Sequence, residues 1–398
     1  MKLSTYLQYV LCYASSAVAY PGMGETMKDL KRSAAKVARE ESKQLIGDLK
    51  TLKDSQLTSI GKDIKAIILD QKDAQSSTID TSAPPGTPDS AACKADLCCV
   101  WKWISYDMTA KFNGTSGRCT KFARGAVRLG FHDAGVWSNT TSYGGADGSI
   151  LLTDELNRAD NNGLGPIADQ MKTWYAKYNK YGVSMADLIQ MGANIATVVC
   201  PLGPRIRSFV GRKDNAKAGP TGLLPDVNDS ADKIIKLFQA KTIDPHDLTA
   251  LVGAHTTSQQ HFVNTARDGD PQDSTPGVWD VEFYGETVST SPPRVFKFAS
   301  DVALSKDSRV KDEWTEFING QRHWNEDYSK AYTRLSLLGV NNINDLKECT
   351  KVLPPARNSF VSQDQKILDL WLQGQYNQLN NLVDDAIMLT GLISTGTA

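Results

Sequence analysis

Two of the five histidines lie in segments whose residue types could support acid–base or metal chemistry. In the segment 128–133 (RLGFHD), helical spacing predicts that Arg128, Phe131 and His132 share one face. Asp133 then points roughly 100° away from that face. A guanidinium beside an imidazole and an aromatic wall suits a pocket that stabilises developing negative charge. The alternative is a surface arginine that only happens to fall four residues before a core histidine.

The second histidine completes an apolar stripe with the spacing i, i+3, i+4, i+7, formed by Leu248, Leu251, Val252 and His255. Asp244-Pro245 supplies a cap and a first-turn proline before this stripe, which predicts a helix starting there. The imidazole of His255 is therefore expected to point inward from the buried face of that helix. A single inward histidine can also be an ordinary core residue, and this is the alternative to a ligand role.

The elements that must position these side chains are predicted to be helices. From residue 91 to about residue 355 the apolar spacing is mainly helical, and Ser184 with Asp187 resembles a capping box. No sustained alternation of apolar and polar residues predicts a large sheet. We therefore expect a mainly α fold.

Composition changes divide the chain into four parts. Residues 1–19 have the charge, apolar run and small-residue ending of a secretory signal, and the run is shorter than the roughly 20 residues of a membrane span. Residues 20–90 read as a charged helical extension followed by a proline-rich linker. Residues 91–356 form the expected globular domain, and residues 357–398 form a tail, expected to be helical, with enough apolar residues to dock on it.

The overall charge argues against nucleic-acid binding through a broad basic surface. The 398 residues carry 44 Lys+Arg and 45 Asp+Glu, which gives a formal net charge of −1. With 40% hydrophobic residues the chain can bury a large core, so it is neither disordered throughout nor fibrous.

The cysteines and sequons agree with export. Cys12 leaves with the predicted signal, and an even set remains: Cys93, Cys98, Cys99, Cys119, Cys200 and Cys349. Six cysteines can pair in fifteen ways, and their spacing alone selects none. A zinc cluster is the alternative, but the chain has no CxxC pair and Cys98 adjoins Cys99. Glycosylation sequons begin at Asn113, Asn139 and Asn228.

Several motifs in order resemble the haem peroxidases of the plant, fungal and bacterial superfamily, most closely the secreted fungal class (class II) that includes lignin and manganese peroxidases. The resemblance runs from Cys93 to Pro355. In chain order the motifs are 128–133 (distal histidine), 144–149 (GGADGS, first calcium loop), Glu155 with 161–164, Cys200-Pro201 leading to Gly211-Arg212, 253–256 (GAHT, proximal histidine), 273–280 (DSTPGVWD, second calcium loop) and Ser300-Asp301.

This resemblance implies a two-lobed helical fold with haem b between a distal and a proximal half. His255 is then the axial ligand of the haem iron, and its Nδ1–H donates to Asp301. His132 acts as the acid–base group toward hydrogen peroxide, and Asn161 holds its tautomer. The implied catalytic set is Arg128, Phe131, His132, Asn161 and Asp301.

The resemblance also implies two Ca²⁺ sites, one beside each histidine. The first ligand set is Asp133, the Gly145 carbonyl, Asp147 and Ser149. The second is Thr256, Asp273, Thr275, the Val278 carbonyl and Asp280. Solvated acidic turns are the alternative for either loop alone.

The family pairing of cysteines implies three disulfides: Cys93 with Cys99, Cys98 with Cys349, and Cys119 with Cys200. A fourth family disulfide is missing, since Asp312 occupies one of its positions.

The specialised oxidation sites of the family are missing as well. Thr120, Arg124 and His261 stand where the manganese ligands are expected, and Ala250 stands where the lignin-type tryptophan is expected. We therefore expect a secreted, monomeric peroxidase that acts on hydrogen peroxide and small phenolic or dye-like donors, with no membrane or nucleic-acid partner. Two alternatives stay open: a lignin- or manganese-type enzyme with a relocated oxidation site, and a calcium-stabilised binding protein of the same fold without catalysis.

Overall fold

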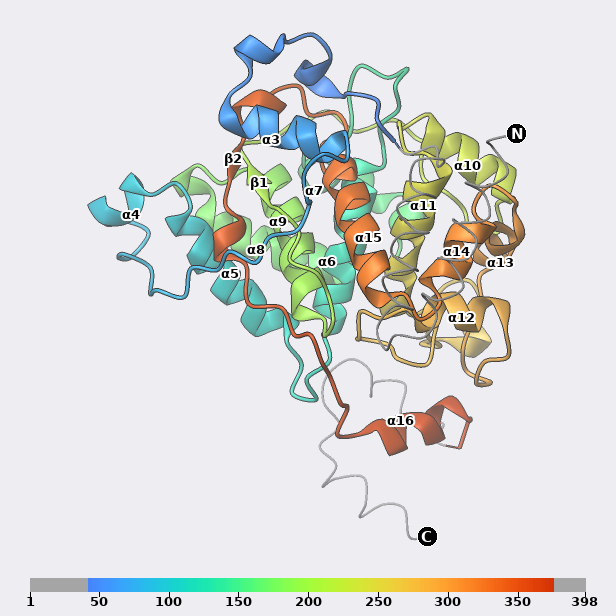
Figure 1. The fold of residues 1–398 in the computed structure, drawn as a ribbon. Coiled ribbons are helices and arrows are strands. Elements are labelled where there is room, and N and C mark those ends of the chain that lie inside the picture. The colour runs from blue at the N-terminus through green and yellow to red at the C-terminus, as the bar shows by residue number, and fades with distance from the viewer. Residues whose placement is uncertain (1–41, 376–398) are drawn as a thin grey trace, which may run out of the picture. The chain divides into compact units, whose positions relative to one another are not determined.

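Helices make up most of the regular structure in residues 42–375, the part of the chain that this computed structural model describes (Figure 1). The helices of the first half are α3 (Ser59–Ile68), α4 (Ala91–Ala95), α5 (Cys99–Phe112), α6 (Lys121–Ala134), α7 (Ser149–Leu152), α8 (Gly165–Tyr178) and α9 (Met185–Val199). Those of the second half are α10 (Ala231–Gln239), α11 (Pro245–Val252), α12 (Glu282–Val288), α13 (Ala299–Lys306), α14 (Lys311–Phe317), α15 (Gln321–Leu335) and α16 (Gln365–Leu372). The expected mainly α fold is confirmed.

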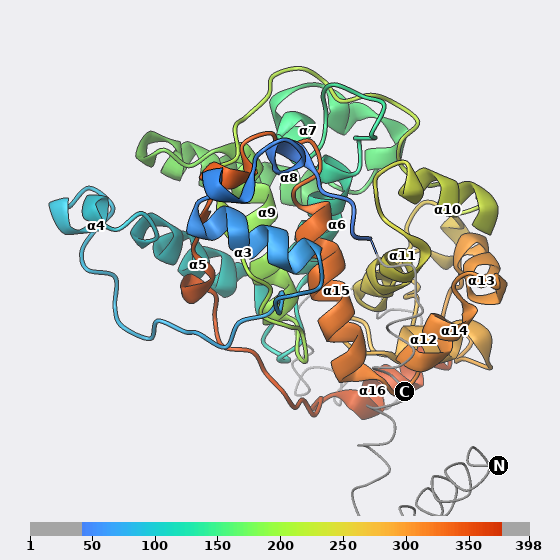
Figure 2. The ribbon, with the colours of Figure 1, turned by 45° about the horizontal axis from the view of Figure 1, so that its top comes forward.

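Two helix groups meet along α15 (Figures 1 and 2). Helices α5, α6, α8 and α9 pack together, while α10 to α14 form the second group, and α15 packs against α11 and α14. Gln190 of α9 ties the first group to α15, because its amide donates to the Gly130 carbonyl (3.0 Å) and its oxygen accepts from the Tyr332 hydroxyl (2.9 Å). Gly130 has to be glycine, since a Cβ there would overlap the Tyr332 hydroxyl.

The only sheet in residues 42–375 has two antiparallel strands. Strand β1 (Phe209–Val210) pairs with β2 (Lys347–Glu348), with Phe209 opposite Glu348. This short ladder joins the segment after α9 to the segment after α15. The expected absence of a large sheet is confirmed for this part of the chain.

Residues 42–74 belong to the main hydrophobic core, which differs from the predicted extension outside the domain. Ile46, Leu49, Ile64 and Ile67 are at most 1% exposed and pack into the same cluster as α5, α6 and α9. Helix α3 lies beside α15 in both views of the ribbon. The sequence did not predict this burial, because the buried face of α3 is narrow and charged residues lie on the rest of the helix. Residues 82–90, the predicted proline-rich linker, contain no helix or strand.

The three disulfides agree with the implied pairing. Cys93 is bonded to Cys99, Cys98 to Cys349, and Cys119 to Cys200. The second bond joins the start of α5 to the segment after β2, and the third joins α6's N-terminal loop to the end of α9. All six sulfurs are thus paired, which excludes the zinc alternative for these cysteines.

The two predicted helix starts behave differently. The Ser184 hydroxyl accepts from the Asp187 amide (3.1 Å), so this cap is confirmed. Helix α11 begins at Pro245 as predicted, but the Asp244 side chain makes no cap hydrogen bond. The helix also ends earlier than predicted, at Val252, and His255 lies in the 3₁₀ turn Gly253–Thr257. The turn brings the backbone at Gly253 against Tyr284 and Trp324, where a Cβ would not fit.

The C-terminal tail includes α16, which docks outside the main core. Leu368, Trp371 and Leu372 form a separate apolar cluster with Val295. The Arg294 guanidinium lies over the Trp371 ring at 4.9 Å. The predicted helical docking is seen for residues 365–372. The rest of the tail beyond residue 375, and the predicted signal at residues 1–19, lie outside the described residues, and within them no helix is long and apolar enough to cross a bilayer.

The buried pair Arg118–Asp364 is predicted to hold α16 in place. The guanidinium contacts both carboxylate oxygens, at 2.8 and 2.5 Å, and both side chains are buried. Asp364→Ala leaves a buried guanidinium without its carboxylate, so the local opening free energy of α16 is expected to fall by about 3 kcal/mol. Amide hydrogen exchange of residues 365–372 measures this change. Asp369→Ala, on the exposed face of the same helix, is the control, and equal exchange in both variants contradicts the prediction.

Candidate active site

Helix α6 brings Arg128 and His132 together on one face, as its spacing predicted. Arg128 Nε donates to His132 Nε2 at 3.2 Å. The same guanidinium donates to the carbonyls of Asn162 (2.7 Å) and Asp160 (3.0 Å), so the loop before α8 fixes it over the imidazole. Arg128 stays partly open to solvent while His132 is buried. The arrangement places a fixed positive charge beside a single ring nitrogen, which disfavours a coincidental surface arginine.

The tautomer of His132 follows from its second partner. Its Nδ1 lies 2.7 Å from Asn161 Oδ1, and the Asn161 amide donates to the Glu155 carbonyl at 2.7 Å. The amide orientation is thereby set, Nδ1 carries the proton, and Nε2 keeps its lone pair. Burial, together with the Arg128 charge, lowers the pKa of His132 to about 3. His132 is therefore a neutral base at any ordinary pH.

Phe131 forms the aromatic wall beside this base. Its ring stacks on Phe238 of α10 at 6.0 Å and meets the His132 ring edge-on at 5.6 Å. The contact joins the two helix groups next to the site. Phe131 thus restricts how the imidazole can turn.

The second histidine is held in a matching way. His255 Nδ1 lies 3.0 Å from Asp301 Oδ2 on α13, and Asp301 is buried. The rings of Phe283 and Phe298 meet the imidazole edge-on at 5.7 and 5.6 Å. Among residues 42–375 no polar group bonds to His255 Nε2. A carboxylate-oriented imidazole with a free, accessible Nε2 is suited to hold a haem iron, so these residues fit the implied cofactor.

The first loop gathers buried oxygens beside His132. Asp133 is completely buried, and one of its oxygens accepts from the Gly148 amide at 3.2 Å. Its other oxygen and the Ser149 hydroxyl have no hydrogen-bond partner. Asp147 accepts from the Ser149 amide (3.1 Å) and from Asn215 (3.0 Å), and the Gly145 carbonyl accepts from the Asp147 amide. Burial and the charge of Asp147 raise the pKa of Asp133 well above its usual value.

The second loop repeats this pattern beside His255. Asp273 and Asp280 both contact the Thr256 hydroxyl, at 2.5 and 3.3 Å, and both contact the Thr275 hydroxyl, at 3.3 and 2.9 Å. Burial raises the pKa of Asp280 to about 7 and that of Asp273 well above its usual value. Val278 lies in the same loop, where its amide donates to the Thr275 carbonyl. Two buried carboxylates with convergent hydroxyls are typical of a site for a hard divalent cation.

Two features of the structure gave no sequence signal. The carbonyls that anchor Arg128 are backbone groups, which every residue carries. A buried group of His246, Glu313, His323 and Asp327 also lies outside the motifs, although His323 and Asp327 have the i, i+4 spacing of a helix face.

Comparison with known proteins agrees with this geometry. The family model described as Peroxidase matches residues 104–320. The chain is 31% identical to Ligninase LG5 of Phanerodontia chrysosporium over 293 residues, which cover 67% of this chain and 77% of that protein. It is 32% identical to Ligninase C of Trametes versicolor over 285 residues (65% and 75%), and 30% identical to a Peroxidase of Arthromyces ramosus over 283 residues (65% and 76%).

The matched region contains both anchored histidines and one of the three disulfides, Cys119–Cys200. The chain therefore belongs to the peroxidase family, as a haem peroxidase of the class II fungal type that uses hydrogen peroxide.

Proposed function

We propose that this peroxidase oxidises small phenolic or dye-like donors by one-electron steps, with haem b held by His255. The observation that carries the proposal is the pair of histidines whose Nδ1 atoms are both anchored, to Asn161 and to Asp301. When bound, haem supplies the redox-active iron that exchanges electrons with hydrogen peroxide and with the donors. The non-catalytic binding protein is disfavoured, because such anchoring leaves both Nε2 atoms available for chemistry.

The distal residues would carry the proton chemistry. His132 Nε2 takes a proton from one oxygen of hydrogen peroxide and returns it to the other, so that water leaves. Arg128 stabilises the negative charge that grows on the departing oxygen. Because Arg128 Nε now bonds to His132 Nε2, the peroxide oxygen has to replace it as the partner of that nitrogen.

The surroundings disfavour manganese as the donor. At the corresponding positions the buried Arg124 guanidinium bonds to Gln259 (2.5 Å), and the buried Thr120 hydroxyl donates to the Lys111 carbonyl. His261 pairs with Asp268 at 2.7 Å. An arginine there repels Mn²⁺, whereas a manganese site needs carboxylate oxygens.

A surface tryptophan relay is also disfavoured. Ala250 is completely buried, and none of the eight tryptophans, all of which lie in residues 42–375, is exposed. Trp103 is the least buried, and its Nε1 donates to the Gly86 carbonyl. No exposed indole in residues 42–375 is therefore available to accept electrons from large donors.

We further propose that both loops bind Ca²⁺ and that the chain is secreted as a monomer. The orphaned oxygens of Asp133 and Ser149 and the paired carboxylates of Asp273 and Asp280 support the calcium sites. Three disulfides support an oxidising compartment, and the sequon residues Asn113, Asn139 and Asn228 are all exposed. Mass spectrometry of the secreted product tests the signal, because retention of Met1 contradicts it.

The haem assignment is tested by absorption spectra. The wild type is expected to show a Soret band after reconstitution with haem, and His255→Ala is expected to lose it, because the iron then lacks its ligand. His132→Leu is expected to keep the band. A wild type without a Soret band contradicts the proposed function.

The distal mechanism is tested by stopped-flow kinetics with hydrogen peroxide. His132→Leu is expected to lower the second-order rate constant by about 10²–10⁴, because the proton carrier is gone. His261→Leu, which changes an exposed histidine, is the control. Since the pKa of His132 is about 3, the wild-type rate constant is expected to fall only as the pH approaches that value. Arg128→Leu removes a charge that lowers this pKa, so the rate constant of this variant is expected to begin falling at a higher pH than that of the wild type.

The calcium proposal makes a pH-dependent prediction. Without calcium, the pKa of Asp280 is about 7 in the folded chain and 3.8 in the unfolded chain. Between these two pH values the folded state therefore holds a proton that the unfolded state releases. The calcium-free chain is therefore expected to lose stability as the pH rises through the window. The drop in Tm caused by a calcium chelator should be larger near neutral pH than in mild acid. Asp280→Asn should weaken this difference, whereas Asp268→Asn at an exposed position should not.

Donor specificity is tested by steady-state turnover of a small phenol, Mn²⁺ and a high-potential dye. We expect turnover of the phenol and no Mn²⁺-dependent activity. Saturable Mn²⁺ oxidation would favour the relocated-site alternative.

A further inference from the structure

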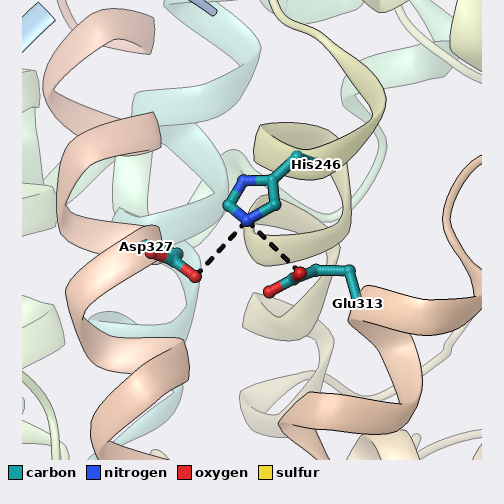
Figure 3. Close-up of side chains that lie close together, drawn as sticks. All are labelled: His246, Glu313 and Asp327. Atoms are coloured by element: carbon teal, nitrogen blue, oxygen red, sulfur yellow. Dashed lines mark ion pairs between the residues drawn. The ribbon is translucent and has the colours of Figure 1, made fainter. Parts of the chain in front are cut away.

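Four buried metal-ligand side chains from three helices meet in the second half of the domain, outside the proposed haem and calcium sites. They are His246 of α11, Glu313 of α14, and His323 and Asp327 of α15, and each is between 3 and 6% exposed. Figure 3 shows His246 pointing between Glu313 and Asp327. The ligand atoms of these three residues all lie within 4.8 Å of one another.

The spacings match a coordination shell. His246 Nε2 lies 3.3 Å from Glu313 Oε2 and 3.6 Å from Asp327 Oδ2. His323 Nε2 lies 3.3 Å from Glu313 Oε1 and 2.8 Å from Asp327 Oδ2. Two ligands at about 2.0–2.1 Å from a tetrahedral metal ion are about 3.3 Å apart, so each of these four spacings lies within about half an ångström of that value.

The two imidazoles are oriented as metal ligands. His246 Nε2 and His323 Nε2 lie within ion-pair distance of Glu313 and Asp327, but without the angles of a well-formed hydrogen bond. On the opposite side of its ring, His246 Nδ1 faces Asp247 Oδ1 at 3.4 Å, and His323 Nδ1 faces Glu316 Oε2 at 3.9 Å. A carboxylate behind the ring is the usual way in which proteins orient a metal-binding histidine. Both free nitrogens thus point into the cluster.

We propose that His246, Glu313, His323 and Asp327 bind one structural divalent transition-metal ion, with Zn²⁺ as the ion that fits best. Two imidazoles with two carboxylates suit Zn²⁺, whereas Ca²⁺ takes roughly six to eight oxygens. The four ligands are buried and lie outside the proposed haem site, so the ion serves structure. It would clamp α11, which leads into the turn carrying His255, to α14 and α15.

The competing arrangement is a cluster of ion pairs around protonated histidines. Burial opposes a charge on His246, but in the metal-free chain Asp247 and Glu313 outweigh it and raise the pKa of His246 to about 10. Protonated histidines would balance the charges of Glu313 and Asp327 in one arrangement, and a divalent metal ion would balance them in the other. Metal content distinguishes the two arrangements.

The test measures zinc in the purified holoenzyme. The protein is dialysed against Zn²⁺ and then against zinc-free buffer that contains Ca²⁺, and zinc per chain is determined by mass spectrometry. We expect about one zinc per chain, with anomalous scattering at the zinc edge between the four side chains. The double variant His246→Gln/Asp327→Asn is expected to hold about tenfold less zinc than the wild type, or less still, and to keep its Soret band unchanged. Glu326→Gln, one position before Asp327 and bonded to Arg322 at the surface, is the matched control.

Two results overturn the proposal. One is a wild type that retains no zinc, which leaves the protonated cluster. The other is a double variant that retains zinc as the wild type does. Should the double variant fail to fold, Asp247→Asn takes its place, because loss of the carboxylate behind His246 is expected to weaken zinc binding about 10- to 100-fold. The haem and calcium experiments are independent of either result.

Discussion

The site depends on one kind of interaction: a hydrogen bond from Nδ1 of a histidine to a fixed side-chain oxygen. Asn161 makes this bond to His132, and Asp301 makes it to His255. The partners differ in charge, and the difference suits the two roles. Asn161 is neutral, so burial and the nearby Arg128 charge keep His132 unprotonated, whereas the Asp301 carboxylate increases the electron density on the imidazole that is proposed to hold the iron. Each bond leaves Nε2 as the only nitrogen available for chemistry.

Both histidines are coupled to buried acidic loops through the backbone. Asp133 follows His132 directly, and Thr256 follows His255 directly, so each loop contributes a residue next to one of the two anchored histidines. Buried carboxylates as close as Asp273 and Asp280 repel each other unless a proton or a cation lies between them. The stability of each loop is therefore linked to the position of the neighbouring histidine.

Helix α15 connects the parts of the core that are far apart in sequence. Tyr332 reaches Gln190 on α9, and Trp324 donates to the Ala250 carbonyl on α11 at 2.8 Å. The segment from residue 42 adds to this contact, because the buried Arg334 donates to the Gln44 carbonyl and α3 packs on the same helix. An N-terminal segment that looks like a charged extension thus supports the helix on which both halves of the site rest.

The sequence by itself determined the local part of this protein. The spacing of Arg128, Phe131 and His132, the cap at Ser184 and the helical character of the chain depend on neighbours within one or two turns, and all were predictable. The end of α11 before His255 was not, because the tight turn is imposed by Tyr284 and Trp324 from other helices. The burial of residues 46–68 and the meeting of His246 with Glu313 and Asp327 likewise needed the tertiary structure. Such contacts join residues more than thirty positions apart, and no local spacing encodes which distant surface a helix face will meet.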